Sequence, residues 1–459
     1  MIKNSASFIM LGFVLLALPC HGAENDAQEK NTGATIAQDV QFPNGFHNGG
    51  IGACDGCHSK TNNSTASGSA ASFRNSSGST AQGQDTSRGM FNGQDPSSTC
   101  LLCHMAKKGQ KQPWGYYVAT DSEDLGGGIP PSQMTPGGDF GWLKKTYRWS
   151  SHEGSTLKDG LSPGDHHGHN IVAAQFGYNP DFSNIMAPGG SYPSEKLSCT
   201  SCHDPHGSYR RLADGSFTTS MTVPITSSGS YKSSPNPDAS HAVGAYRLLA
   251  GKGYSPKITD SSVTFTADPP AAVAPDIYNR AEPKLGDTRV AYGSGMSEWC
   301  ENCHKPHNHP TGNTAKISPT VVTQYNSYVA SGDMTGSKST AFSSLVPFEI
   351  GSNDYAELKS LAGNGGKGAD LSGLKAGDNV MCLTCHRAHA SGWDAITRWN
   401  SKSELIVYNG KYPGIDNSAP AHVAQGRTSI ETQKAYYDRP VEAFALYQRG
   451  LCSKCHAKD

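Results

Sequence analysis

The chain has few of the apolar side chains that usually build a soluble core. Of its 459 residues, 36% are hydrophobic and 8% are aromatic, and the mean hydropathy is −0.52. Regular helix and strand patterns are scarce, and 52 glycines and 27 prolines interrupt the sequence throughout. This composition excludes a conventional thick core. It is typical either of disorder or of a chain that wraps other apolar material.

Net charge and long hydrophobic runs are also lacking. A formal net charge of −1 argues against a nucleic-acid partner. The apolar run 8–18 is too short to span a bilayer, and no later stretch is long and apolar enough to do so. Because Lys3 precedes this run and small residues follow it, residues 1–23 are predicted to be a secretory signal peptide. Residues 24–45 are then a polar N-terminal extension, and residues 46–459 a single unit.

The sequence is rich in one motif, Cys-x-x-Cys-His, which occurs six times and takes twelve of the thirteen cysteines. We number the copies 1 to 6 in chain order. Their cysteines are Cys54 and Cys57, Cys100 and Cys103, Cys199 and Cys202, Cys300 and Cys303, Cys382 and Cys385, and Cys452 and Cys455. Their histidines are His58, His104, His203, His304, His386 and His456.

This spacing is typical of covalent attachment of c-type haem. The two thiols bond to the haem vinyl groups, and the histidine binds the iron from one face. One copy would also suit a thioredoxin-like or zinc site, but six copies indicate six covalently bound haems c. The porphyrins would supply the missing apolar surface. Consecutive first cysteines lie 46, 99, 101, 82 and 70 residues apart, so we expect no copied haem modules.

Eleven histidines remain beyond the signal peptide and the motifs, enough for a second axial ligand on each of six irons. Three of them, His206, His307 and His389, lie three residues after a motif histidine. Two histidines on opposite faces of one iron have Cα atoms about 12 Å apart, whereas three residues span at most about 10–11 Å. Each of the three is therefore predicted to bind the iron of a different, closely packed haem.

The other histidines carry weaker signals. His309 lies two residues after His307 and would point the other way in an extended segment, so it is a candidate for a further haem. The segment 165–170 holds three histidines, of which we expect one to be a ligand and two to be solvated. Three more have no local signal and are predicted to have no ligand role: His152, His241 and His422.

Secondary-structure signals are modest. Short helices are expected around the motifs and over residues 441–456, where apolar residues recur at roughly helical spacing. Residues 61–88 and 225–240 are rich in small polar residues and are predicted to be loops or linkers.

Several long strings are far more specific than the motif itself. They include QMTPGGDFGWLKKTY (133–147), CTSCHDPHGSYRR (199–211), TRVAYGSGMSEWCENCH (288–304), CLTCHRAHASGWDAITRWN (382–400) and YQRGLCSKCHAKD (447–459). From about Phe46 to Asp459 the chain resembles the OmcS-type extracellular hexahaem cytochromes, the nanowire subunits of Geobacter relatives. The resemblance implies a mostly irregular fold with short helices and little sheet, wrapped around a stacked haem chain. It also implies bis-histidine irons and extracellular filaments in which one haem takes its distal histidine from the next subunit.

Carried over position by position, the resemblance implies six distal ligands: His47, His169, His206, His307, His309 and His389. The family has a further histidine three residues after motif 1, which is associated with the neighbour's haem. Thr61 stands there in this chain and cannot serve as a useful iron ligand. Either His47 or another histidine takes over the role between subunits, or the polymer contact differs.

These features predict an exported electron-transfer protein rather than an enzyme. It would reach the cell surface through the periplasm, polymerise with itself and meet its redox partners there. Two alternatives stay open. A discrete periplasmic or outer-surface shuttle would carry the same haems, and a multihaem reductase would need one iron with an open distal position. No Cys-x-x-Cys-Lys variant marks such an iron.

Overall fold

The computed structural model describes the second of two units into which the chain separates, Met1–Thr32 and Gly33–Asp459. The described residues are 57–58, 91–107, 116–256, 263–282, 287–305, 309–327, 338–365 and 370–456. The predicted signal peptide, the 24–45 extension and the 61–88 loop lie outside them, as do four residues singled out above: His47, Cys54, Thr61 and His307.

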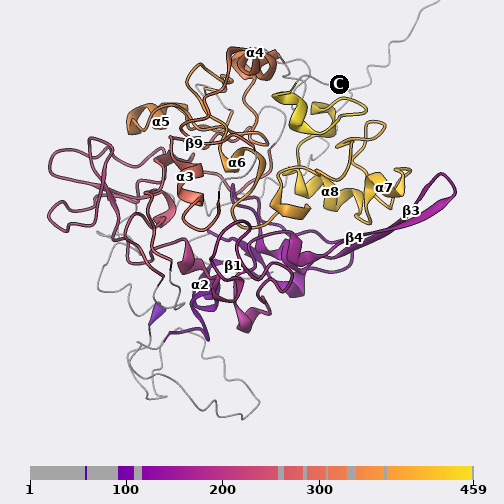
Figure 1. Ribbon diagram of the computed structural model, residues 1–459, viewed down its shortest axis with the longest axis horizontal. Coiled ribbons are helices and arrows are strands. Elements are labelled where there is room, and N and C mark those ends of the chain that lie inside the picture. Colours follow the sequence, from indigo (N-terminus) through magenta and orange to yellow (C-terminus); the bar gives the residue numbers. More distant parts are fainter. Residues whose placement is uncertain are drawn as a thin grey trace, which may run out of the picture. The chain divides into compact units, whose positions relative to one another are not determined.

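Loops make up most of the described chain, and its regular elements are short (Figure 1). The helices are α2 (Pro96–His104), α3 (Met296–Cys300), α4 (Pro319–Ser327), α5 (Tyr355–Leu361), α6 (Cys382–Cys385), α7 (Ala421–Ala424) and α8 (Ser429–Ala435). The strands are β1 (Met105–Ala106), β2 (Ala119–Thr120), β3 (Tyr147–Glu153), β4 (Thr156–Ser162), β5 (Arg210–Arg211), β6 (Phe217–Thr218), β7 (Val243–Gly244), β8 (Ala272–Val273) and β9 (Ala291–Tyr292). The predicted fold class, irregular with short helices and little sheet, is confirmed.

Helix starts follow local capping chemistry. At α2 the side chain of Asp95 accepts from the Ser98 backbone N–H at 2.6 Å, and Pro96 occupies the first helical position. At α8 Thr428 and Glu431 form a capping box, in which each side chain accepts from the other's backbone N–H. Such caps let helices of two or three turns form in a chain with so few apolar residues.

The strands pair in small sheets, β1-β2, β3-β4, β6-β5-β7 and β8-β9. The longest is the antiparallel ribbon of β3 and β4, in which Tyr147 lies opposite Ser162 (Figure 1). A Cβ at Gly160 would come within 2.0 Å of the Trp149 ring, so a glycine is required for this ring to lie across the ribbon.

Two expectations about secondary structure have different outcomes. Residues 225–240 form the predicted loop, with isolated bridges at Ile225 and Tyr231. Residues 441–456 contain only two 3-10 turns, η13 (Val441–Ala443) and η14 (Leu451–Lys454), instead of a continuous helix. Between them Arg449 forms an antiparallel bridge with Leu405, and this pairing draws the backbone into an extended path.

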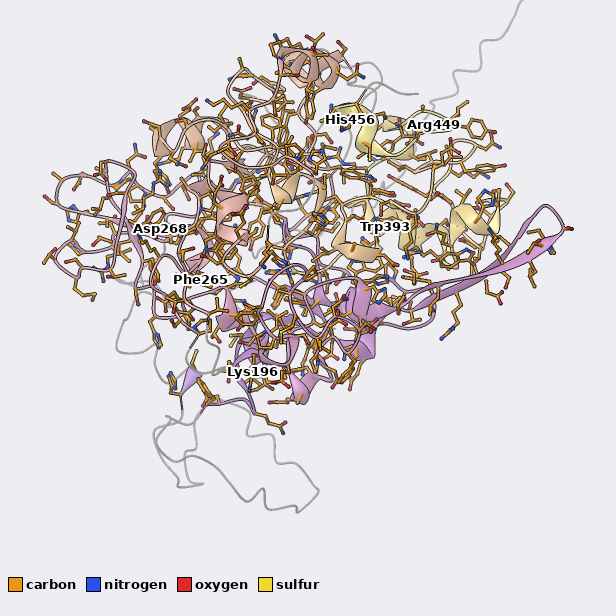
Figure 2. The ribbon with its side chains drawn as sticks, in the orientation of Figure 1. Lys196, Phe265, Asp268, Trp393, Arg449 and His456 are labelled. Carbon is orange, nitrogen blue, oxygen red and sulfur yellow. The ribbon has the colours of Figure 1, made fainter. Side chains whose placement is uncertain are left out.

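A buried polar network ties the β3-β4 ribbon to the C-terminal part of the chain. Arg427, 1% exposed, lies over the rings of Trp393 and Tyr147 at 4.7 and 4.1 Å (Trp393 is labelled in Figure 2). Its Nη2 donates to Ser162 Oγ at 3.0 Å, and Ser162 Oγ donates to Asp394. Burial alone would raise the pKa of the Asp394 carboxyl, but hydrogen bonds, the first from His167, hold it well below its usual value.

Replacing Asp394 with Asn should lower the free energy of unfolding by about 2–4 kcal/mol at neutral pH, because the buried Arg427 and the half-exposed Lys402 lose a counter-charge. A carboxyl whose folded pKa is lowered stabilises the fold above its unfolded pKa, and that contribution is lost as the pH falls through the folded value. The difference from wild type should therefore shrink below about pH 4. Guanidinium unfolding followed by circular dichroism at pH 7 and pH 3 measures it.

The matched control is Asp159→Asn on the exposed ribbon, where the carboxylate accepts from Ser150 Oγ at 2.6 Å. That change should cost no more than about 0.5 kcal/mol at either pH. Equal losses for the two variants, or a loss at Asp394 that does not depend on pH, would contradict the role assigned to the buried network.

Candidate haem-binding sites

Each motif from 2 to 6 begins with a helical turn that gathers its functional side chains. In motifs 3 to 6 the backbone N–H of the histidine donates to the carbonyl of the first cysteine at 3.0–3.1 Å. Motif 2 forms the last turn of α2. Because residues three and four apart lie on one face of such a turn, both thiols and the imidazole are presented together. This is the local geometry that covalent haem attachment requires.

Three motif histidines each face a histidine from a distant segment. The ring centroids are 6.0 Å apart for His169 and His304, 6.3 Å for His203 and His389, and 6.1 Å for His309 and His456 (His456 is labelled in Figure 2). Because a metal–imidazole bond is about 2 Å long, two imidazoles on opposite faces of one iron have ring centroids about 6 Å apart. The three pairs therefore have the spacing that a haem iron needs.

Backbone carbonyls fix the orientation of most of these rings. Six candidate ligands have Nδ1 within 3.3 Å of a carbonyl oxygen: His104 with Tyr116 (2.6 Å), His169 with Ala388 (2.6 Å), His203 with Arg247 (2.7 Å), His304 with Pro188 (3.3 Å), His309 with Pro310 (3.0 Å) and His386 with Ala395 (2.9 Å). An Nδ1–H donated to a carbonyl selects the tautomer whose Nε2 carries a lone pair for a metal.

Burial keeps the rings in the neutral form that binds metal. Desolvation lowers the pKa of His104, His169 and His203. For His389, burial first and the nearby His203 and His169 next lower the pKa to about 3. Both effects favour the neutral imidazole, which is the form that binds iron.

The remaining predicted ligands are placed less completely. His206 is 71% exposed, with its Nδ1 3.6 Å from Asp204 Oδ1. His58 lies against Phe91, with ring centroids 5.1 Å apart. Three candidates, His169, His309 and His389, face the histidines of motifs 4, 6 and 3. Of the six predicted distal ligands, His47, His206 and His307 then remain for motifs 1, 2 and 5.

One expectation about the 165–170 cluster is wrong. His169 is the ring that faces a motif histidine, but His167 is fully buried rather than solvated. Its Nδ1 lies 3.1 Å from the Trp142 carbonyl and its Nε2 2.8 Å from Ser162 Oγ. Because both ring nitrogens are engaged, His167 is a structural member of the buried network and not a ligand. His152 and His422 are exposed, as expected, and His241 pairs with Asp238.

The motifs lie beside one another in chain order. The thiols of Cys100 and Cys199 lie close enough to raise the pKa of Cys100, and those of Cys300 and Cys382 lie close enough to raise the pKa of Cys300. The other successive motifs are close enough for their thiols to interact electrostatically: Cys57 with Cys103, Cys202 with Cys303, and Cys385 with Cys452. These sulfurs are the attachment points of different haems, so the attachment sites follow one another from 1 to 6.

Motifs 2 and 3 pack in the same way as motifs 4 and 5. In each unit a serine three residues before the even motif accepts from the first cysteine of the odd motif. Ser97 Oγ accepts from Cys199 N, and Ser297 Oγ accepts from Cys382 N, both at 3.2 Å. The expectation of no copied modules, drawn from unequal gaps, is therefore wrong for these four motifs. The two units share their contacts, and they differ in the number of residues between their motifs.

The odd motifs of the two units share a further device. His203 and His386 each form an antiparallel bridge, with Leu249 and Thr397. The imidazole of each of these motif histidines bonds to the backbone carbonyl of the residue two places before its bridge partner, Arg247 for His203 and Ala395 for His386. That residue and the next both have left-handed φ, +52° and +56° at Arg247 and Leu248, and +54° and +56° at Ala395 and Ile396. Left-handed non-glycine residues cost about 1–2 kcal/mol each, so the recurrence marks a functional backbone.

Sequence reasoning missed these acceptors because a backbone carbonyl leaves no residue signature. The segments around Arg247 and Ala395 read YRLLAG and DAITRW and share no pattern. The serines were detectable, since Ser-x-x-Cys-x-x-Cys-His occurs in motifs 2 and 4 alone.

In the described part of the chain, no group of three or more His, Cys, Asp or Glu side chains could hold a bare metal ion. A haem iron, already held by its porphyrin, needs only the two axial imidazoles that three pairs supply. Nor is any helix among these residues long and apolar enough to cross a membrane.

The chain is similar to proteins of known family and structure. A family model described as the Class III cytochrome C family matches residues 19–123. C-type cytochrome OmcS of Geobacter sulfurreducens is 46% identical over 433 residues, which are 90% of this chain and 94% of that protein. The chain belongs to the OmcS family of c-type cytochromes.

Solved structures agree with this assignment. OmcS nanowires from Geobacter sulfurreducens, determined by cryo-EM, match with a TM-score of 0.75 at 45% identity, over 88% of this chain and 98% of that one. The Outer Membrane Cytochrome S filament of the same organism matches with a TM-score of 0.74 over the same shares. The predicted membership of the OmcS family is confirmed, and it implies covalently bound haem c.

Replacing His389 with Ala should open the haem attached to motif 3, and not the haem of motif 5 beside which it stands in sequence. The reason is the 6.3 Å separation of the His389 and His203 rings. One haem per chain should become high-spin by electron paramagnetic resonance, and added imidazole should restore its low-spin signal. A cryo-EM map of the cyanide-treated variant locates the opened iron.

The exposed His241 provides the control, because His241→Ala leaves every candidate ligand in place. All of its haems should stay low-spin. Cyanide found at motif 5 in the His389 variant, or unchanged spectra, would show that the pair does not hold the motif 3 iron.

Proposed function

We propose that this chain carries six covalently attached haems c and conducts electrons along them as the subunit of an extracellular filament. The main support is the set of three imidazole pairs with ring centroids 6.0–6.3 Å apart, in each of which a motif histidine faces a histidine from a distant segment. When bound, haem supplies one-electron exchange at its iron, and the protein supplies ligands, burial and spacing.

The chain's own residues have separable tasks. Two neutral imidazoles would hold each haem iron, which would favour electron transfer over substrate binding and argues against a reductase. The carbonyls of Arg247 and Ala395 hold two motif rings in the ligating tautomer. The contacts Cys100–Cys199 and Cys300–Cys382 bring successive attachment edges together, so that electrons pass between neighbouring haems.

Filament assembly is favoured over a discrete shuttle by the two matching structures, which are a nanowire and a filament. The N-terminal signal would direct the chain through the periplasm to the cell surface. No enzymatic step is required of it there, and its partners are further copies of itself and redox proteins or acceptors at the surface.

The described pairs suggest how the copies join. Motif 3 faces His389, the residue three places after the motif 5 histidine. Motif 3 thus takes its second ligand from the residue three places after the histidine of the motif two positions later in the chain. The same relation assigns His206, three places after the motif 3 histidine, to motif 1. It assigns motif 5 a ligand from the segment after motif 1 of a neighbouring copy. In this chain Thr61 stands three places after the motif 1 histidine, and threonine is not a useful iron ligand. Between the predicted signal peptide and residue 151, His47 is the only histidine outside the motifs. We therefore assign His47 to a neighbouring subunit's haem, and His307 to the remaining iron.

Ligation by two histidines throughout can be tested spectroscopically. Near-infrared magnetic circular dichroism of the oxidised filament should show only low-spin His/His bands, with six haems per chain by pyridine haemochrome assay. A high-spin or His/Met component in the native protein would contradict two histidine ligands on every iron and would favour the reductase alternative.

His47→Ala should leave one haem per subunit five-coordinate or misligated and should weaken or abolish filaments, because assembly would no longer complete a haem site. Negative-stain electron microscopy and paramagnetic resonance measure the two effects on one sample. His152→Ala, which changes an exposed histidine of the ribbon, is the control and should form normal filaments.

A different outcome would assign His47 to a haem of its own chain. Motifs 4 and 6 each face a histidine that lies before the preceding odd motif in sequence, His169 before motif 3 and His309 before motif 5. Because His47 lies before motif 1, the same relation would give His47 to motif 2 of its own chain. Intact filaments with one misligated haem would establish that placement and refute the assignment between subunits.

A further inference from the structure

His389, the histidine that faces motif 3, lies where three distant segments of the chain meet. Its backbone N–H donates to the Gly137 carbonyl at 2.7 Å, and its own carbonyl accepts from the His169 backbone N–H at 2.9 Å. The backbone around His389 is therefore held on both sides, by segment 137–138 and by segment 168–169.

Glycines at both contacts allow the three segments to pack this closely. A Cβ at Gly138 would overlap the Ala390 carbonyl, and a Cβ at Gly168 would lie 2.5 Å from the His389 carbonyl oxygen. Gly138 also has a φ of +96°, which other residues rarely adopt. Because the opposing atoms belong to the backbone, they cannot move aside as the end of a flexible side chain can.

The plane of the His389 imidazole is fixed by an aromatic ring. The Phe140 ring stacks on it, with ring centroids 4.8 Å apart and an angle of 22° between the planes. A Cβ at Gly137 would lie 2.9 Å from Nδ1 of the same imidazole. Phe140 and Gly137 thus limit how far the ring can turn.

Phe140 is itself held in place. It is 3% exposed, and the Tyr178 ring packs against its ring at 6.4 Å in an edge-on arrangement. Its backbone N–H donates to the Val118 carbonyl at 2.9 Å, and the Val118 N–H donates to the carbonyl of the motif 2 histidine at 2.9 Å. The stacking ring is therefore anchored to a neighbouring attachment site.

The imidazoles that face each other have defined angles between their planes. The angle is 59° for His389 and His203, and 44° for His169 and His304. Because the angle between two axial imidazole planes affects the splitting of the iron d orbitals, residues that fix a ring plane also tune the metal.

We propose that Phe140 and Gly137 are positioning residues that hold the His389 imidazole at its angle to His203 across the motif 3 iron. This inference rests on the ligand pairing proposed above and adds two residues that touch neither the iron nor its porphyrin ligands. Phe140 acts by stacking on the ring, and Gly137 acts by leaving room beside Nδ1.

The same segment also positions the second ligand of the motif 4 haem. The His389 carbonyl accepts from the His169 backbone N–H, and the Ala388 carbonyl oxygen lies 2.6 Å from His169 Nδ1. The second ligands of haems 3 and 4 are therefore positioned as one unit. A change at Gly168 reaches both haems, whereas a change at Phe140 reaches the motif 3 haem alone.

The test compares haem-loaded Phe140→Leu and Gly137→Ala with wild type by electron paramagnetic resonance of the oxidised protein. In each variant one of the six low-spin signals should move to a different largest g value, because the His389 plane turns. Cyanide should also replace the second ligand of one haem per chain faster than in wild type, since that imidazole is held less firmly. Gly168→Ala should move two signals.

Two matched controls carry the same substitutions elsewhere. Phe444, 6% exposed, packs against Tyr412 and Tyr436 and not against a candidate ligand, so Phe444→Leu should keep all six signals. Gly127→Ala should do the same, because a Cβ there would lie more than 4 Å from every described residue other than its chain neighbours. Both controls should bind cyanide at the wild-type rate.

The outcomes separate this proposal from the proposed function. Six unchanged signals and an unchanged cyanide rate in Phe140→Leu and Gly137→Ala would overturn the positioning role, while the proposed function stands. A single moved signal in Gly168→Ala would show that the two ligands are not positioned as one unit. Fewer than six haems in the wild type would instead count against the proposed function.

A cryo-EM map of native filaments covers variants that fail to fold. It should show the Phe140 ring stacked on an iron-bound His389, with Gly137 beside Nδ1. A Phe140 ring that lies apart from an iron-bound His389 would overturn the proposal.

Discussion

The opposition of two imidazoles about 6 Å apart is the constraint on which the rest of the structure depends. Each described pair joins segments far apart in the sequence, such as His203 with His389, and no helix or sheet connects them. The backbone between such segments is therefore free to be loop, provided that it returns each ring to its place. The carbonyl bonds to Nδ1 perform this task, because they fix both the position and the tautomer of a ring without a regular element.

The repeated unit of two motifs shows what the fold preserves and what it lets vary. The serine contact, the neighbouring thiols and the two left-handed residues recur in motifs 2–3 and 4–5, whereas the intervening segments differ in length and sequence. Strain of about 1–2 kcal/mol per left-handed residue persists only where surrounding contacts enforce it. Here the bridge from the motif histidine enforces it, since Asp204 N and Arg387 N donate to the second residue of each left-handed pair. The recurrence supports a common geometry for the two haems concerned.

Sequence alone was sufficient for the parts of the site made by side-chain identity. The six motifs and the loop-rich fold can be read from the sequence. Among the candidate ligands, His389 is predicted from its spacing after a motif, His309 from its place beside His307, and His169 from the family resemblance. The structure brings each of these three rings to about 6 Å from a motif histidine. The buried role of His167 was not legible, since its neighbours in the sequence are polar and its partners Trp142 and Ser162 come from other segments. The repeat was hidden for a similar reason. It consists of hydrogen bonds to backbone atoms, which any residue can make, and unequal loop lengths mask it.

The shortage of apolar residues and the scarcity of regular elements have one cause. A chain with 36% hydrophobic residues has too few apolar side chains to build a thick core of its own. A covalently bound haem c brings a large apolar plane to its attachment site, and loops that pack against this plane bury apolar surface without a helix or a sheet. The cofactor then completes the core. We therefore expect folding of the chain to be coupled to covalent haem attachment, as the folding of small metal domains is coupled to metal binding.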